Sequence, residues 1–230
     1  MTTWVPPSEL LFQCEGIWRP RSVSKVSYPD DGNEACYQVE EDSYWFHHRN
    51  ACILEALQKF PPTGTLYDIG GGNGFVALGM QKAGFDVVLV EPGSGAMNAA
   101  KRGLQRVIWA TLDDAGLHDG AVPAAAAFDV VEHIEDDISF VKTIRRTLKP
   151  GGRFYCTVPA SGFLWSGEDT RAGHFRRYNR ATLADVMGAA GFEVEFISSF
   201  FSWLTVPVFF LRALPWRLAE GGRGKGEEGG

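Results

Sequence analysis

An acidic residue followed by closely spaced glycines is the stretch of this chain best suited to chemistry. Residues 65–74 read Thr-Leu-Tyr-Asp-Ile-Gly-Gly-Gly-Asn-Gly, so Asp68 ends a short apolar run. The glycines are Gly70, Gly71, Gly72 and Gly74. Glycine in a strand-to-helix turn adopts backbone conformations that other residues avoid, and its missing side chain lets a ligand approach the backbone. The stretch therefore predicts a nucleotide-cofactor site.

The glycine spacing separates the candidate cofactors. A dinucleotide fingerprint places glycine at the first, third and sixth positions, so that a pyrophosphate meets a helix N-terminus. Counted from Gly70, the sixth position is Phe75. Asp68 would repel a pyrophosphate but attract an ammonium group. The residues therefore favour a cationic cofactor over a phosphorylated one.

A second acid ends the next apolar run, residues 86–91. Glu91 lies roughly 20 residues beyond Asp68, where a carboxylate at a strand tip can accept hydrogen bonds from a ribose diol. A nucleoside that carries an amino-acid group suits both acids, and S-adenosylmethionine is such a molecule.

Five motifs in this order resemble class I S-adenosylmethionine-dependent methyltransferases. The motifs are residues 68–74, 90–92, 128–136 (Phe-Asp-Val-Val-Glu-His-Ile-Glu-Asp), 148–152 and 158–159. The resemblance covers roughly residues 41–200. It is closest to bacterial methyltransferases with a Gly-His-x-Arg-Arg-Tyr segment, here residues 173–178.

The resemblance implies further cofactor contacts. Asp113 matches the acid that meets the adenine amino group, with its neighbour Asp114 as an alternative. The helix before the glycine turn is expected to cover the cofactor, with Arg49 near the methionine carboxylate; the alternative is that its aromatic residues are plain core. The predicted cofactor set is completed by Pro92, Leu112 and Glu132.

Two histidines are the candidate catalytic residues. His133 follows Glu132 just past the fourth expected strand of the core, and an imidazole with a pKa near 6.5 can accept a proton from an acceptor hydroxyl at neutral pH. The alternative is that His133 caps the following helix or packs under the adenine. His174 is the second candidate, in the later loop.

The loop around His174 is a candidate acceptor site. It contains Trp165, Arg176, Arg177 and Tyr178, and paired arginines can bind a carboxylate or phosphate of the acceptor. A structural salt-bridge cluster between Asp169 and the arginines is the alternative.

Strands and helices alternate in the elements that must position these residues. Strands are expected at 65–69, 86–91, 106–110, 124–131 and 152–158, and helices at 74–83, 94–102 and 136–147. This order predicts an α/β fold with a doubly wound, mostly parallel Rossmann-like sheet and helices on both faces. Ligands bind at the carboxyl ends of such strands, where the acids fall.

The ends of the chain are expected to differ from this core. We expect an irregular arm over 1–40 that packs on the core, and an S-adenosylmethionine-binding methyltransferase domain over 41–200 that begins with a lid-like helix over 41–60. A helix over 180–190 and a strand over 192–198 end the domain. An apolar segment and a Gly/Glu/Arg/Lys tail make up 201–230. The family's last antiparallel strand is either 204–211 or missing.

Composition limits the partners. The 230 residues carry a formal net charge of −6, which disfavours a nucleic-acid partner. Four cysteines without C-x-x-C spacing predict neither a metal site nor a disulfide scaffold. The N-terminus lacks a secretory signal, so we expect a cytoplasmic protein.

An uncharged stretch, residues 197–211, is too short to span a bilayer, which needs about 20 residues. A peripheral membrane contact or a homo-oligomer contact through 197–218 is one expectation, and packing on the protein's own core is the other.

These observations predict methyl transfer from S-adenosylmethionine to an O, N or C nucleophile of a small or medium-sized acceptor. A non-catalytic S-adenosylmethionine-binding protein is one alternative. An NAD-dependent oxidoreductase is another, which Phe75 disfavours.

Overall fold

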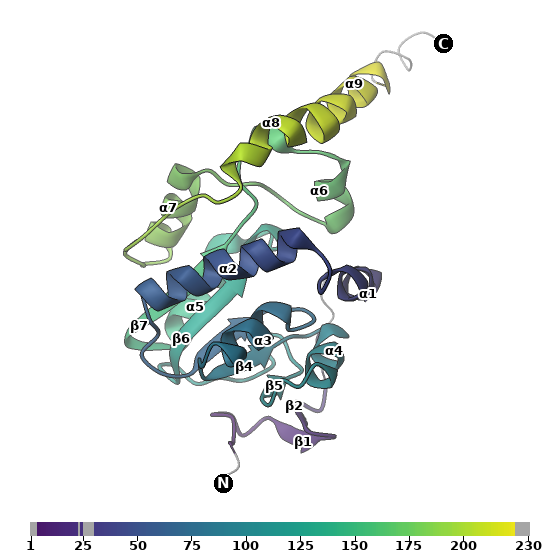
Figure 1. Cartoon of the computed structure of the whole chain (residues 1–230). Helices are drawn as coiled ribbons and strands as arrows, with labels where there is room; N and C mark the ends of the chain where they lie inside the picture. The colour runs from purple at the N-terminus through teal and green to yellow at the C-terminus, as the bar shows by residue number, and fades with distance from the viewer. Residues whose placement is uncertain (1–3, 23, 25–29, 224–230) are drawn as a thin grey trace.

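A seven-stranded sheet forms the body of the computed structural model, which describes residues 4–22, 24 and 30–223 (Figure 1). The strand order is β1-β2-β5-β4-β3-β6-β7, and only the edge pair β1 and β2 is antiparallel. The strands are β1 (Phe12–Cys14), β2 (Ile17–Arg19), β3 (Leu66–Ile69), β4 (Val87–Val90), β5 (Val107–Ile108), β6 (Val122–Phe128) and β7 (Leu148–Thr157). The expected α/β fold with a mostly parallel sheet is confirmed.

Helices follow most strands of the parallel core, as the apolar periodicity predicts. The α-helices are α1 (Asp30–Val39), α2 (Tyr44–Lys59), α3 (Phe75–Lys82), α4 (Gly95–Lys101), α5 (Asp137–Thr147), α6 (Gly167–Ala172), α7 (Arg180–Ala189), α8 (Thr205–Val208) and α9 (Leu214–Arg223). Short 3₁₀-helices are η1 (Val131–His133), η2 (Gly162–Leu164) and η3 (Ser202–Leu204), and a π-helical segment, η4 (Phe209–Ala213), joins α8 to α9.

The sheet buries a separate hydrophobic cluster on each face. On one face Leu66 and Leu89 pack with residues of α2, α3 and α4. On the other face Tyr67 and Val88 pack with residues of α5 and α7. Because side chains alternate between faces along a strand, Asp68 shares the face of Leu66 and lies beneath α2.

Small residues bring the central strands together at the site. Four consecutive alanines, residues 124–127 of β6, are fully buried between β3 and β7. Asp68 is in register with Leu89 of β4 and Ala126 of β6. The carboxyl ends of β3, β4 and β6 therefore meet at one edge.

The N-terminal region is more regular than expected. The irregular arm predicted for 1–40 is wrong over the described residues, because β1 and β2 form a hairpin whose second strand pairs with β5, and α1 follows. The edge of the sheet thus gains two strands, and Leu11 and Ile17 of this region are buried in the core clusters.

The C-terminal region also differs from the expectation. No strand is formed over 192–198, and residues 204–211 are helical, so within the described residues the sheet ends at β7. Pro207 lies in the short first turn of α8, where its missing N–H costs little. The far end of α9 points away from the sheet in Figure 1. Residues 224–230 of the predicted tail lie outside the described residues.

None of the described helices is both long and apolar enough to cross a membrane.

Candidate active site

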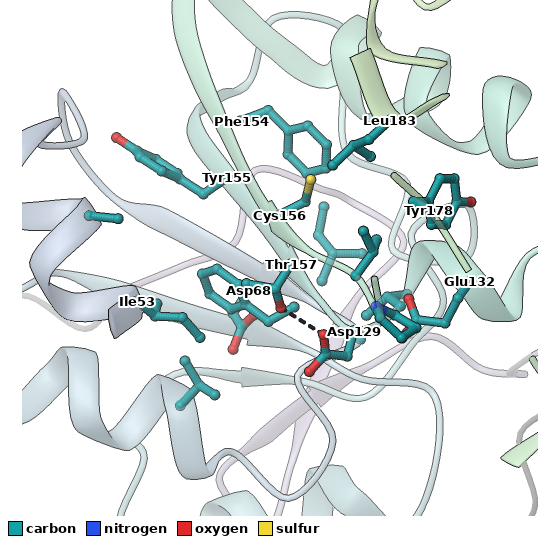
Figure 2. Close-up of a pocket in the computed structure, with 18 of the residues that line it drawn as sticks. Ile53, Asp68, Asp129, Glu132, Phe154, Tyr155, Cys156, Thr157, Tyr178 and Leu183 are labelled. Carbon is teal, nitrogen blue, oxygen red and sulfur yellow. Dashed lines mark hydrogen bonds between the residues drawn. The ribbon is translucent and has the colours of Figure 1, made fainter. Parts of the chain in front are cut away.

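A cleft of about 2360 Å³ extends from the carboxyl ends of the strands along the edge strand β7. Figure 2 shows Phe154 of β7 beside Leu183, Tyr155 projecting in the other direction, and Asp68, Asp129 and Glu132 nearby. The volume exceeds the roughly 300–1,000 Å³ of a typical small-molecule site, so the cleft has room for more than one ligand.

Asp68 is a buried acid without a partner. Its side chain has no solvent exposure, and neither carboxylate oxygen has a hydrogen-bond partner among the described residues. Burial raises the pKa of Asp68 to about 7; Arg49 lowers it and Glu91 raises it further. An ionised carboxylate in this position is costly until a cation or donor reaches it.

The glycine turn packs around this acid. Gly70, Gly72 and Gly74 have positive φ angles of 71°, 54° and 73°. A Cβ on Gly71 would lie 2.6 Å from Asp68 Oδ2 and 2.2 Å from Leu89 Cδ1. Glycine at position 71 is therefore required by the protein's own acid and core, independently of any ligand.

Glu91 ties the turn to the second strand. Its Oε2 accepts a hydrogen bond from Gly72 N at 2.9 Å, and its Oε1 accepts one from Gly93 N at 2.7 Å. Burial raises the pKa of Glu91, and these two bonds counteract the rise. An ionised carboxylate has about four acceptor positions, so two remain for a ligand.

Arg49 reaches the cleft from α2. Its guanidinium donates to Phe128 O at 3.2 Å and pairs with Asp129 Oδ2 at 2.6 Å, while its buried Nε has no partner among the described residues. On the same helix Trp45 stacks on Phe201 with ring centroids 4.0 Å apart. Helix α2 therefore contacts both Asp129 and the C-terminal segment.

Asp129 is a site residue to which the sequence analysis gave no role. It follows β6 with a φ of 57° and accepts a hydrogen bond from Thr157 Oγ1 at 2.8 Å, drawn in Figure 2. A left-handed backbone is uncommon outside glycine, and Asp tolerates it better than most residues. The strand expected over 124–131 included Asp129, whereas β6 ends at Phe128, so its place at the strand end was missed.

The two predicted histidines lie together with Glu132. One ligating atom from each of Glu132, His133 and His174 lies within 4.8 Å of the others, and the imidazole rings meet edge-on with centroids 4.7 Å apart. Burial and the neighbouring His174 lower the pKa of His133 to about 4, so its ring is neutral at pH 7. His133 does not cap the following helix, because Asp136 does.

Asp169 anchors the loop that carries His174. Its carboxylate lies 2.9 Å from His174 Nδ1 and accepts 2.7 Å and 3.0 Å bonds from Arg177. Although burial opposes ionisation, these donors and Ser166 N lower the pKa of Asp169. The salt-bridge alternative is confirmed for Arg177.

The remaining predicted acceptor residues serve other contacts. Tyr178 OH donates to Asp137 Oδ2 at 2.7 Å, and Arg176 pairs with the same oxygen at 2.7 Å. Tyr178 and Arg177 still line the cleft, whereas Trp165 and Arg176 are not among its lining residues.

The residues around Asp113 are divided between the cleft and the N-terminal region. Asp113 and Leu112 line the cleft, as does Pro92, whose carbonyl accepts a bond from Trp109 Nε1 at 2.8 Å. Asp114 instead accepts hydrogen bonds from Ser24 N and Ser24 Oγ. The geometry therefore favours Asp113 over its neighbour as a ligand contact.

Side chains of the edge strand β7 and of α7 also line the cleft, and the sequence analysis did not identify them. Phe154, Tyr155, Cys156 and Leu183 all line the cleft. Burial and the carboxylates of Glu132 and Asp129 raise the pKa of Cys156 to about 12, so its thiol is not a nucleophile. Alternation along β7 gave no sign that this strand faces a ligand.

The sequence has relatives of known class. A family profile described as a methyltransferase domain matches residues 44–196. A protein of Mycolicibacterium smegmatis named a probable S-adenosylmethionine-dependent methyltransferase is 27% identical over 180 residues, covering 76% of this chain and 70% of that protein. A ubiquinone biosynthesis O-methyltransferase of Caulobacter vibrioides is 33% identical over 127 residues, covering 46% of this chain and 50% of its own length.

Solved structures share the fold. A chain of the complex between the Haloferax volcanii Trm112 methyltransferase activator and a methyltransferase aligns with a TM-score of 0.62 and 20% identity, covering 75% of this chain and 80% of that one. Phosphoethanolamine N-methyltransferase 2 of Haemonchus contortus, solved with S-adenosylmethionine, aligns with a TM-score of 0.60 and 19% identity, covering 91% and 52%. At these identities the likeness concerns the fold alone.

Proposed function

Since the chain belongs to the S-adenosylmethionine-dependent methyltransferases, we propose that it transfers a methyl group to a hydroxyl oxygen of a small or medium-sized acceptor with an apolar body. The observation that carries the acceptor class is the apolar lining that Phe154, Tyr155 and Leu183 give the cleft along the edge strand β7. The O-methyltransferase among the relatives supports the same choice.

The acids of the cleft fit this cofactor. Asp68 has two buried oxygens without partners, which suit the ammonium group of the methionine part. Glu91 has two unused acceptor positions for the ribose diol, and Asp113 lies in the cleft for the adenine amino group. Arg49 is assigned to the methionine carboxylate, through its unpartnered Nε.

S-adenosylmethionine supplies an activated methyl group when bound. The chain's own contribution is to hold the acceptor oxygen in line with it and to exclude water. Such alignment contributes up to about 7 to 11 kcal/mol to lowering a barrier. Helix α2 and the C-terminal segment, joined by the Trp45–Phe201 stack, are assigned to closing the cleft.

The paired arginines argue against a phosphate or carboxylate acceptor. Arg176 is compensated by Asp137 and Arg177 by Asp169, so neither offers an uncompensated charge. A neutral hydroxyl compound suits these surroundings better than an anion. His133, with its low pKa, is a weak general base, and we assign it a role in orienting the acceptor.

Assays that follow the transfer of a labelled methyl group to a panel of acceptors test the proposal. The panel contains phenols with apolar substituents, matched anilines, and matched carboxylates and phosphate esters. We expect the wild-type protein to form product from the phenols. At limiting cofactor, the Asp68→Asn variant should form at least tenfold less product than the wild type. Transfer to amines alone would overturn the acceptor class. Cofactor binding without any transfer would favour the non-catalytic alternative.

We also propose that the exposed apolar side chains of the C-terminal helices contact a membrane surface. Trp203, Val206, Phe210, Leu211 and Leu218 are each more than half exposed. An amphipathic helix with large apolar residues and flanking arginines is typical of interfacial binding, and an acceptor with an apolar body would reside there.

Sedimentation with phosphatidylcholine vesicles tests this contact. The variant Phe210→Ser/Leu211→Ser/Leu218→Ser is expected to lose most of the binding, whereas Val5→Ser/Val194→Ser, which changes exposed apolar residues elsewhere, keeps it. A protein that ignores vesicles and forms a dimer through the same residues would instead support the homo-oligomer alternative.

A further inference from the structure

We propose that Glu132, His133 and His174 bind one divalent transition-metal ion beside the methyl-transfer site. Their ligating atoms lie within 4.8 Å of one another, although His174 is far from the other two in sequence. Zinc ligands at about 2.0–2.2 Å from one ion are roughly 3.4 Å apart in a tetrahedral site, so side-chain rotations that bring these atoms closer by up to about 1.4 Å close the site. The two segments that carry them, η1 and the loop after α6, are joined by the hydrogen bond from Phe175 N to Glu132 O.

Glu132 gives an independent indication of a ligand. Its side chain is 1% exposed, and its Oε2 has no hydrogen-bond partner among the described residues. A cation bound to Oε2 would stabilise the ionised carboxylate, which burial alone disfavours.

The surroundings of the histidines match those of metal ligands. Asp169 accepts a bond from His174 Nδ1, which leaves the Nε2 lone pair available for an ion. The carboxylate of Asp169 is itself fixed by Arg177 and Ser166 N. A carboxylate behind a histidine ligand fixes its tautomer and orientation. Backbone groups of Ala172 and Gly173 interact with His133 in a similar way.

The donor set selects the class of ion. Two imidazoles and one carboxylate suit Zn²⁺, Co²⁺, Mn²⁺ or Fe²⁺, whereas Mg²⁺ and Ca²⁺ prefer oxygen ligands. Three protein ligands leave a position open in a tetrahedral site, as in zinc enzymes. We assign this open position to the acceptor oxygen, and this assignment rests on the proposed function. A bound ion would lower the pKa of the acceptor hydroxyl.

Calorimetry of the metal-free full-length chain with ZnCl₂ tests the site. We expect one Zn²⁺ per chain, with affinity at least 100-fold weaker in Glu132→Gln and His174→Ala. Asp169→Asn, which changes a positioning residue, should weaken binding by about 10- to 100-fold. Controls are Glu135→Gln and His118→Ala, which change exposed residues. Cys52→Ala tests adventitious binding at the Cys52–His48 pair, whose Sγ and Nε2 are 3.8 Å apart.

Cobalt provides a second readout that does not depend on protein stability. Co²⁺ added to the wild-type chain should give the strong visible absorption of a four-coordinate site, and Glu135→Gln should give the same spectrum. Absence of Zn²⁺ and Co²⁺ binding to the wild-type chain would overturn the proposal, as would binding that Cys52→Ala abolishes. S-adenosylmethionine calorimetry on the same samples separates failure of the metal site from failure of the proposed function.

Discussion

Asp68 combines complete burial with an unsatisfied negative charge, which a folded chain tolerates at a cost. Burial raises its pKa from 3.8 to about 7, so near neutral pH the carboxyl group is close to half protonated. The raised pKa means that Asp68 stabilises the fold fully below about pH 4 and that this contribution is lost as the pH rises through 7. Burial favours the protonated form of Asp68, whereas an ammonium group of a bound ligand favours the ionised form.

We therefore predict that S-adenosylmethionine binds more tightly as the pH rises from 5.5 to 7. The ionised fraction of a group with a pKa of about 7 grows roughly tenfold over this range, so the Kd should fall roughly tenfold. A ligand α-amino group, with a pKa near 7.7–8.0, stays charged throughout. Calorimetry at both pH values measures the effect.

Asp68→Asn is the control for this pH dependence. It removes the titrating group but keeps the volume, so the Kd should be higher and nearly independent of pH over the same range. If the Kd of Asp68→Asn changes with pH as much as that of the wild type, another acid of the cleft causes the pH dependence. Glu91, whose pKa is also raised by burial, is such an acid.

A second residue-scale prediction concerns Tyr178, which the sequence analysis placed in the acceptor site. Its hydroxyl donates to the buried Asp137, so Tyr178→Phe should lower the free energy of unfolding by about 1–3 kcal/mol. Urea denaturation measures this loss. Asn179→Ala at the start of α7 removes a cap of similar worth away from the cleft and serves as a comparison. If Tyr178→Phe raises the KM for the acceptor without lowering the free energy of unfolding, Tyr178 has a role in substrate binding instead.

Which site residues the sequence could predict depends on how local their signals are. Asp68 and Glu91 stand at the ends of apolar runs, next to glycines, and both lie where the pattern indicated. The grouping of Glu132 with His174 depends on the loop after α6 folding back over η1, for which no spacing rule exists. The role of Asp129 depends on Arg49, which comes from a distant helix.

At the scale of elements, a buried ion pair positions the helices that precede the cleft. Arg102 of the loop after α4 pairs with Glu40, which follows α1, and also donates to Asn73 O in the glycine turn. The side chains of Arg102 and Glu40 are only 3% and 10% exposed. Removing one partner of such a pair leaves a buried charge.

We predict that Arg102→Ala lowers the free energy of unfolding by about 3–5 kcal/mol. Arg106→Ala, which breaks the more exposed Arg106–Asp86 pair, should cost about 1 kcal/mol or less. Urea denaturation of both variants measures the difference. Equal losses would show that the Arg102–Glu40 pair does not hold α1 against the glycine turn.

The elements that the sequence predicted are those whose apolar pattern is continuous. Strands β3 and β4 are fully buried runs, and α5 alternates buried and exposed positions with helical period. Strands β1 and β2 have three residues each and depend on pairing at the sheet edge, which a local pattern does not reveal. The alternation of Phe192, Val194 and Phe196 indicated a strand, but Phe192 packs on Phe154 and Phe196 on Phe60 through side chains alone.

At the scale of the whole molecule, the sheet carries the buried acids Asp68 and Glu91, and the segments beyond β7 carry the loop with His174. The two parts meet at the cleft, where His174 contacts His133 and Phe201 contacts Trp45. A ligand that bridges them stabilises the folded chain as a unit, by an amount set by its concentration relative to its Kd.

We predict that S-adenosylmethionine or S-adenosylhomocysteine at 100 times its Kd raises the free energy of unfolding by about 2.7 kcal/mol. For a chain of this size, the thermal midpoint should rise by about 5–10 °C. NAD at the same concentration should leave the midpoint unchanged, because Phe75 stands where a dinucleotide turn needs glycine. Differential scanning fluorimetry measures all three shifts, and stabilisation by NAD alone would contradict the assignment of the cofactor cleft.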